Sequence, residues 1–447
     1  MSLFFKSLLK KSIILCSSLL MSVSFVNAES LTAMVDSVLS SHENVVNAQK
    51  ELEEASRDIT DSILAYAPDL GIKFETGKAN KANIAAPSQK EFDTWDLTWD
   101  QKIMDSGATQ VDIKNKRLSH EKSELDYITA RNDLLIEAAD AYLGLIKASE
   151  KLQTSIVAEA NTRETSGQEE IRVQVGSGLT SDILKSKRQL ASAQKKVITD
   201  EKAFKSAVYT YEKVFNVDGV DVAQLKKPRL APSTLEFLPN SMEETVELAL
   251  MNNRDLKTSA IDVKIARGDV TSTLAGFGPT IDAAFSFKDK TDASHTADNH
   301  TEEEAKLTID FPLSALYMEM PSYLNDRSAL DRAINDHAVK ERDTVKSAKD
   351  AWQEYANSRT MLSYSENEAA IARELLTITQ KERAADQTDA AAVLAAEETL
   401  AASMNDLSDD SMTLLTSVYE VLDVIGMLEP DMVEDTKTEG TFNTPTE

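Results

Sequence analysis

The chain has 447 residues and a formal net charge of −27, with 75 acidic side chains against 48 basic ones. Such an acidic chain is a poor partner for nucleic acid, which proteins bind mainly through lysine and arginine. Its single cysteine excludes a disulfide within the chain.

The first 28 residues have the pattern of a secretory signal peptide. Three lysines precede an apolar stretch over residues 13–21, and Val26-Asn27-Ala28 predicts cleavage before Glu29. A lipoprotein signal at Cys16 is disfavoured, because Leu15 stands where a small residue is needed. No later segment approaches the ~20 apolar residues of a membrane helix. If the exported chain spans a membrane, it must therefore do so with β-strands.

The mature chain opens with a helical pattern over residues 31–66, which Pro68 ends because proline lacks an N–H and its ring disfavours the helix. The hydrophobic period then changes from 3.6 to 2 in two segments. Their apolar positions are Leu70, Ile72, Phe74, Trp95, Leu97 and Trp99. This alternation predicts two strands with one apolar and one polar face.

A helix is predicted over residues 108–174, which would be ~100 Å long. After the break at Gly176-Ser177-Gly178, a returning helix carries an apolar residue every seven positions, the spacing of a coiled-coil seam. This series is Ile183, Leu190, Val197, Phe204 and Tyr211. A globular domain cannot contain a helix of this length, so we expect a rod or a tube. Residues 217–240 contain three prolines and predict a linker at the equator of the rod.

The second half repeats the first. Pro279 lies 211 residues after Pro68, and two more alternating segments follow it. Their apolar positions are Ile281, Ala283, Phe285, Phe287, Ala305, Leu307, Ile309 and Phe311. A second long helix is predicted over about 323–383. At an offset of 210, the first seam falls on Val393, Leu400, Leu407, Leu414 and Val421. Self-similarity of this kind requires an architecture that uses the unit twice.

The chain therefore divides into five segments. These are a signal peptide (1–28), a first repeat of helix, two transmembrane strands, long helix and return helix (29–216), an equatorial linker (217–240), a second repeat in the same order (241–426) and an acidic disordered tail (427–447). The tail is inferred from its repeated Glu, Asp and Thr residues.

Four strands cannot close a barrel, and unpaired strand edges are very costly in lipid. Three chains would supply a 12-stranded barrel with an aqueous lumen. The predicted fold is therefore mainly α with a small β part: long coiled-coil helices in tandem repeats form an α-helical barrel below a trimeric transmembrane β-barrel. The strand residues expected to face lipid are Trp95, Leu97, Trp99, Phe285, Phe287, Ile309 and Phe311.

Several motifs resemble those of the TolC-like outer-membrane efflux proteins. Each half has a proline-led strand, at Ala67-Pro68-Asp69-Leu70 and Gly278-Pro279-Thr280-Ile281. The stretch from Gln101 to Gly107 is similar to the family's strand exit, Gln-x-Leu-Phe-Asp-Gly-Gly. Residues 138–145 resemble its Ala-x-x-Ala-Tyr-x-x-Leu helix, and 175–184 resemble its tip turn. The second half departs from the pattern, since its strand exit lacks the glycine pair and its tip lacks the usual glycine.

The resemblance implies a passive homotrimeric duct in the outer membrane of a Gram-negative bacterium, with a tunnel through the periplasm. Its implied partners are a periplasmic adaptor protein, an inner-membrane transporter and outer-membrane lipid, within a tripartite efflux or type I secretion system. The implied docking residues of the tip turn are Gly176, Gly178, Leu179, Thr180 and Ser181. The family's acidic entrance position falls on Asp182 in the first half. Its counterpart in the second half is Ala392, so the nearby Asp386 and Asp389 are the candidates for the entrance there.

Simpler interpretations stand beside these. Asp182 and Asp389 are also typical helix caps, which satisfy free N–H groups. His295 and His300 share an acidic loop, but their spacing matches no standard metal site. No motif indicates an enzyme, a nucleic-acid partner, or a catalytic, cofactor or metal site. The alternative to a duct is a soluble periplasmic coiled-coil adaptor or structural protein, whose strands form a small sheet.

Overall fold

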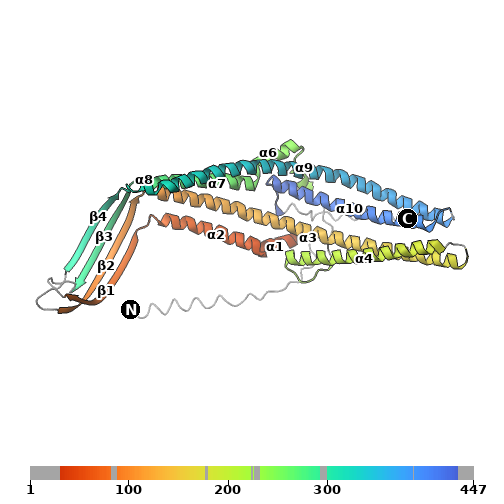
Figure 1. Cartoon of the computed structure of the whole chain (residues 1–447), viewed down its shortest axis with the longest axis horizontal. Helices are drawn as coiled ribbons and strands as arrows, with labels where there is room; N and C mark the ends of the chain where they lie inside the picture. Colours follow the sequence, from red (N-terminus) through yellow and green to blue (C-terminus); the bar gives the residue numbers. More distant parts are fainter. Residues whose placement is uncertain are drawn as a thin grey trace.

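A computed structural model describes residues 31–81, 88–176, 180–222, 225, 232–291, 300–385 and 387–430. Within these residues, an antiparallel sheet extends from one end of a long helical body (Figure 1). The first repeat comprises α1 (Leu31–Ser41), α2 (Glu43–Leu64), β1 (Asp69–Lys81), β2 (Ser88–Met104), α3 (Ala108–Gln174) and α4 (Thr180–Phe215). The predicted signal peptide lies outside the described residues.

The second repeat has the same order, preceded by a short helix in the linker. Its elements are α5 (Pro232–Glu236), α6 (Met242–Asn252), α7 (Arg254–Ala275), β3 (Thr280–Thr291), β4 (His300–Asp310), α8 (Ala315–Met318), α9 (Met320–Ala384) and α10 (Ala390–Val424). The return helices α4 and α10 have 36 and 35 residues, against 67 and 65 in α3 and α9. They therefore end partway along the helical body, as the sequence predicts.

The helix predicted over residues 31–66 is divided in two. It breaks at His42, whose backbone is extended (φ −71°, ψ 135°) and whose Nδ1 accepts the N–H of Asn44 at 3.3 Å. The second repeat breaks between α6 and α7 at Asn253, 211 residues later, where the side chain accepts the N–H of Leu256 at 3.0 Å. A side-chain acceptor caps the new helix at both places, and the asparagine is one of the preferred capping residues. The helix is therefore interrupted at the same position in both repeats.

The sheet has the order β1-β2-β3-β4, and all neighbouring strands are antiparallel. The register places the predicted apolar positions on one face: Leu97 lies opposite both Ile72 and Phe287, and Trp99 lies opposite Phe285. The rings of Phe74 and Trp95 pack in a tilted arrangement, with centroids 4.7 Å apart and an interplanar angle of 42°. Within the described residues, β1 and β4 are the two edges of the sheet.

The strand exits of the two repeats differ. After β2, Asp105 accepts the N–H of Thr109 at 3.0 Å, and Ser106 and Gly107 adopt positive φ angles of 55° and 95°. The Ser106 hydroxyl donates to the carbonyl of Pro279 at 2.7 Å, which ties this turn to the start of β3. After β4 the chain instead forms the short helix α8 before α9 begins.

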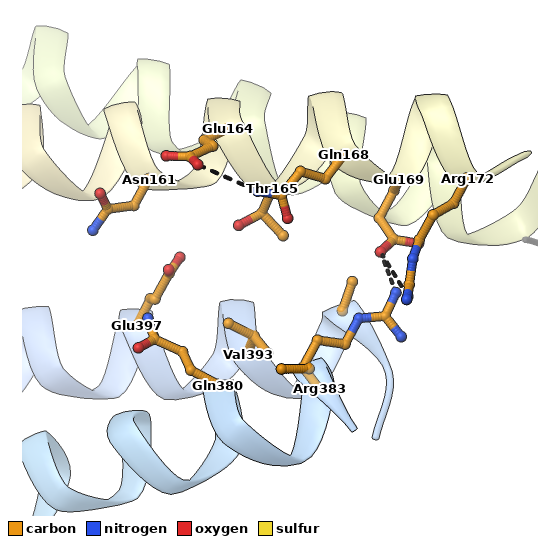
Figure 2. Close-up of a pocket in the computed structure, with 12 residues that line it drawn as sticks. Asn161, Glu164, Thr165, Gln168, Glu169, Arg172, Gln380, Arg383, Val393 and Glu397 are labelled. Carbon is orange, nitrogen blue, oxygen red and sulfur yellow. Dashed lines mark hydrogen bonds and ion pairs between the residues drawn. The ribbon is translucent and has the colours of Figure 1, made fainter. Parts of the chain in front are cut away.

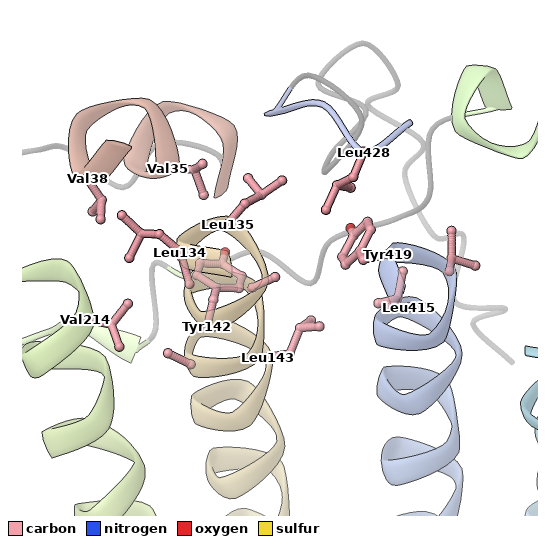
Figure 3. Packing of buried hydrophobic residues seen from close by; sticks show 14 of the residues in the cluster. Val35, Val38, Leu134, Leu135, Tyr142, Leu143, Val214, Leu415, Tyr419 and Leu428 are labelled. Atoms are coloured by element: carbon pink, nitrogen blue, oxygen red, sulfur yellow. The ribbon is translucent and has the colours of Figure 1, made fainter. Parts of the chain in front are cut away.

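The hydrophobic core lies midway along the helical body, where α1, α3 and the C-terminal ends of α4 and α10 meet (Figure 3). Tyr142 and Tyr419 are almost completely buried there, with 0% and 2% of their surface exposed. Aromatic burial of this kind contributes much of the stability of a core. The main hydrophobic core therefore lies between the two ends of the rod. One end carries the sheet, and the other is the tip, where the long helices reverse.

The packed chain continues past the predicted boundary at Gly426. Leu428 is buried, its N–H donates to the carbonyl of Leu422 at 3.1 Å, and its carbonyl accepts from Asn132 at 3.0 Å. The prediction that the disordered tail begins at 427 was wrong for these first residues, because an apolar side chain there completes the core. Residues 431–447 lie outside the described part of the chain.

Candidate functional site

The end of the rod opposite the sheet carries the two turns at which the long helices reverse. In the first turn, Gly176 has a φ of 80° directly after α3, and α4 begins with Thr180 and Ser181. Gly178 and Leu179 of the predicted docking turn lie outside the described residues. Asp386, predicted in the second turn, does so too.

Asp182 lies in the first turn of α4, where it lines a groove of about 250 Å³ between α4 and α10. Its carboxylate lies 3.2 Å from the ammonium of Lys185, and the Ser181 hydroxyl donates to it at 3.4 Å. The charge of Asp182 is thus partly compensated by its own helix. Across the groove, Gln189 of α4 donates to Glu398 of α10 at 2.8 Å.

Asp389 caps α10. Its backbone is extended (φ −92°, ψ 165°), and its carboxylate accepts the N–H of Ala392 at 2.9 Å. An anion at this position also interacts favourably with the helix dipole. The capping interpretation of Asp389 is therefore confirmed, while its role at an entrance stays a prediction.

Arg383, near the end of α9, joins three segments of the tip. Its guanidinium forms an ion pair with Glu169 of α3 and donates to the carbonyl of Thr388, in the turn before α10, at 2.9 Å. Arg172 lies 3.9 Å from the same Glu169 carboxylate, which is only 5% exposed. Loss of one partner from such a buried pair is strongly destabilising, because it leaves the other charge buried and uncompensated. Arg383 therefore holds the second turn against the first hairpin.

The sequence did not single out Arg383 or Glu169. Charged side chains occur along the whole of both long helices, and these two lie 214 positions apart. The available signal was the place of Arg383 in the last turn of α9, where a basic side chain interacts favourably with the helix dipole.

A polar cavity of about 400 Å³ separates α3 from α9 and α10 beside this ion pair (Figure 2). Arg383, Arg172 and Glu169 lie at one end, and Glu164 and Glu397 lie on opposite sides of the other end. Glu397 is 9% exposed. Burial raises its pKa above the ordinary value, and the nearby charge of Glu164 raises it further.

The sheet presents the second surface of interest. Many of its apolar side chains are exposed on the one face that the register defines, with 76% of Ile72 and 65% of Leu307 in contact with solvent. Of the residues predicted to face lipid, Trp95, Leu97, Trp99, Phe285, Phe287 and Ile309 lie in strands on this face, and Phe311 lies one residue past β4. The opposite face is polar and includes the Lys288–Asp96 pair at 3.5 Å.

The described residues were also considered as ligands and as membrane segments, since both bear on function. They contain no group of three or more His, Cys, Asp or Glu side chains able to hold a metal ion. Among their helices, none combines the length and hydrophobicity needed to cross a membrane.

Comparison with known proteins gives one family. The sequence profile of the outer membrane efflux protein family matches residues 34–214. The chain is 23% identical over 330 residues to the alkaline protease secretion protein AprF of Pseudomonas aeruginosa. This match covers 72% of the chain and 66% of AprF, so it spans just under two thirds of that relative.

Solved structures share the whole architecture. The outer membrane protein VceC of Vibrio cholerae superposes with a TM-score of 0.76 at 15% identity, over 89% of this chain and 96% of VceC. The CmeC outer membrane channel of Campylobacter jejuni gives a TM-score of 0.77 at 13% identity, over 89% of this chain and 86% of CmeC. At these identities the likeness shows the fold, and it confirms the predicted combination of long helical hairpins and a four-stranded sheet.

Proposed function

We propose that the chain is a member of the outer membrane efflux protein family and acts as a passive trimeric channel that carries substrates from the periplasm across the outer membrane. The observation that carries the proposal is the sheet. Its four strands have one apolar face, one polar face and two edges, and they extend from a helical rod.

The exposed apolar face favours lipid as the surroundings of the sheet. Transfer of apolar surface out of water contributes about 25 cal/mol per Å². Ile72, Leu70 and Leu307, each at least 65% exposed, thus make this face costly in water. Closure of three sheets would pair β4 of one chain with β1 of the next and leave no free edge in the membrane.

The polar face would then line an aqueous pore. In a barrel of this size, apolar side chains point to lipid and polar ones to the lumen. The chain has no catalytic role in this function, because substrates pass through the pore chemically unchanged. Its net charge of −27 favours the passage of cations.

The helical body would form the periplasmic tunnel, with its tip toward an adaptor protein and an inner-membrane transporter. In this arrangement the Arg383–Glu169 pair closes each chain's contribution to the entrance, since it joins the second turn to α3. Asp182 and Asp389 would add negative charge there.

The likeness to a protease secretion protein favours type I secretion as the pathway served, with small-molecule efflux as the other candidate. Deletion of the gene distinguishes the two. Secretion predicts the loss of a protein from the culture medium at unchanged sensitivity to toxic compounds. Efflux predicts increased sensitivity and an unchanged medium.

The native mass of protein extracted in detergent from purified outer membranes tests the channel itself. We expect a species of three mature chains that forms cation-preferring pores in planar bilayers, with a mass below three times 49.2 kDa because the signal peptide is removed. A monomer or dimer released without detergent would contradict the proposal and favour the soluble coiled-coil alternative. Anion preference in asymmetric salt would contradict the charge argument alone.

A further inference from the structure

The end of the tip cavity away from the arginines contains a buried carboxyl group with no compensating charge. Glu397 of α10 is 91% buried, and its Oε2 atom meets no hydrogen-bond partner among the described residues. Figure 2 shows its carboxylate directed from α10 toward α3 across the cavity. Glu164, on the exposed surface of α3, faces it at the mouth. The two arginines that line the same cavity lie at its other end, with Glu169.

Comparison of the two repeats shows which partner Glu397 lacks. At the offset of 210, Glu397 corresponds to Lys187 of α4, and Gln380 of α9 corresponds to Glu170 of α3. In the first hairpin Lys187 and Glu170 form an ion pair at 2.7 Å. In the second hairpin, neither member of the corresponding pair is a cation. The position is also more buried there, because α10 packs against α3 as well as α9, whereas the Lys187 side chain is 54% exposed.

The surroundings of Glu397 suit a cation from outside the chain. Burying a carboxylate without a hydrogen-bonded counter-charge is costly. The cavity also offers amide oxygens from Asn161, Gln168 and Gln380 and apolar surface from Val393 and Ala390. A volume of about 400 Å³ lies in the range of small-molecule sites. An ammonium group on an alkyl chain would match this combination of acceptors and apolar wall.

A bare metal ion fits less well. The described residues provide no set of three acidic, histidine or cysteine ligands. Magnesium and calcium need six or more oxygen ligands, and magnesium gives up its water reluctantly. Two carboxylates from facing helices would instead accept the three N–H donors of an ammonium group.

We infer that this cavity binds a primary alkylammonium group, with Glu397 as its main anion and Glu164 closing over it from α3. The bound cation bridges the two hairpins of one chain at the tip, beside the Arg383–Glu169 pair. The site is distinct from the acidic residues of the turns, because Asp182 lines the separate groove between α4 and α10. It depends on the tip geometry and not on conduction, so it can be tested separately from the proposed function.

Isothermal titration of the detergent-purified full-length protein with putrescine tests the inference. The buffer must be sodium phosphate, without Tris or other primary amines that would occupy the site. We expect saturable binding of one putrescine per chain. Glu397→Gln keeps the side-chain shape and removes the charge, so it should weaken binding by at least about tenfold, as expected for the loss of a charge-assisted hydrogen bond.

Two variants control the experiment. Glu374, an exposed residue of α9, occupies the repeat position that corresponds to Glu164. Glu374→Gln removes the same charge outside the cavity and should leave the affinity within about twofold, since exposed charges contribute little. The double variant Gln380→Glu with Glu397→Lys supplies the ion pair of the first hairpin. It should remain folded in a thermal melt and should bind no putrescine.

Titration with magnesium chloride distinguishes an alkylammonium group from a metal ion as the cation that the cavity binds. Magnesium binding that Glu397→Gln abolishes, without putrescine binding, would overturn the assignment to an alkylammonium group in favour of a hydrated metal ion. The inference would also be overturned if putrescine failed to bind, or bound with equal affinity to the wild type and Glu397→Gln.

Discussion

The two helical hairpins of the tip share one backbone plan and use their charges differently. In the first, Glu170 and Lys187 form an exposed ion pair between α3 and α4. In the second, the corresponding Gln380 and Glu397 leave one buried carboxylate unpaired, while Arg383 reaches across to the first hairpin. Internal pairing makes a hairpin self-sufficient. A hairpin with an unpaired charge depends on neighbouring groups to compensate that charge. We therefore expect the conformation of the second hairpin to depend more on its surroundings than that of the first.

The largest expected loss of stability comes from substitution of Tyr142, whose counterpart in the second repeat is Trp352. Tyr142 is fully buried, whereas its counterpart Trp352 is only partly buried and packs beside Tyr355. Tyr142→Ala should destabilise the protein by about 3–5 kcal/mol, since it leaves a large cavity. Thermal melting in detergent measures this, with Trp352→Ala as the matched control. Equal losses in the two variants would show that the assembly buries both positions alike.

Arg383→Ala should have the next largest effect. It leaves Glu169 buried without its principal partner, at a cost of about 1–3 kcal/mol once the partial exposure of the pair is allowed for. The second turn would then separate from α3, and we expect single-channel conductance in planar bilayers to rise. Arg163→Ala removes an arginine that is 64% exposed and pairs only within its own helix, with Glu159, so it should leave the conductance unchanged. Unchanged conductance in Arg383→Ala would show that the Arg383–Glu169 pair does not hold the tunnel entrance closed.

Much of the molecule follows from local sequence patterns. The ends of α3 and the strand faces were predicted because proline, glycine and hydrophobic period act over a few residues. The breaks at His42 and Asn253 were not, since a polar cap within a helix has the same appearance as ordinary surface. The Arg383–Glu169 pair and the burial of Glu397 depend on packing between helices far apart in the chain. At the tip, only the capping role of Asp389 was predicted and confirmed.

A smaller effect is expected on the pH dependence of stability, through the buried carboxyl group of Glu397 in the second hairpin. The folded-state pKa of Glu397 is raised, so folding favours its protonated form. Its contribution to stability is therefore present below the unfolded pKa, about 4.3, and is lost as pH rises through the raised folded value. Glu397→Gln should abolish this loss and be more stable than the wild type by about 1 kcal/mol at neutral pH, in amine-free buffer. Melting curves from pH 4 to 8 measure the difference. A constant difference across that range would contradict the assignment.

The smallest effect is expected at Asp182. Lys185 already compensates its charge at 3.2 Å, so Asp182→Ala should reduce blockade of the pore by a trivalent cation only about twofold. Bilayer recordings with increasing cation give the half-blocking concentration. Glu201→Ala, which removes an exposed carboxylate of the same helix that pairs with Lys205, serves as the control. Unchanged blockade would remove Asp182 from the entrance.

The interruption that recurs at His42 and Asn253 also bears on the history of the chain. Two unrelated helices would not be expected to break 211 residues apart, each with a polar cap and each before the same strand pair. We infer that the break predates a duplication and was present in an ancestor of half the length. That ancestor had two strands per subunit and would have required six identical copies to build the same twelve-stranded wall. In the proposed trimer, fusion into tandem halves reduces the copies to three and leaves each half free to diverge, as at the position that holds Lys187 in the first half and Glu397 in the second.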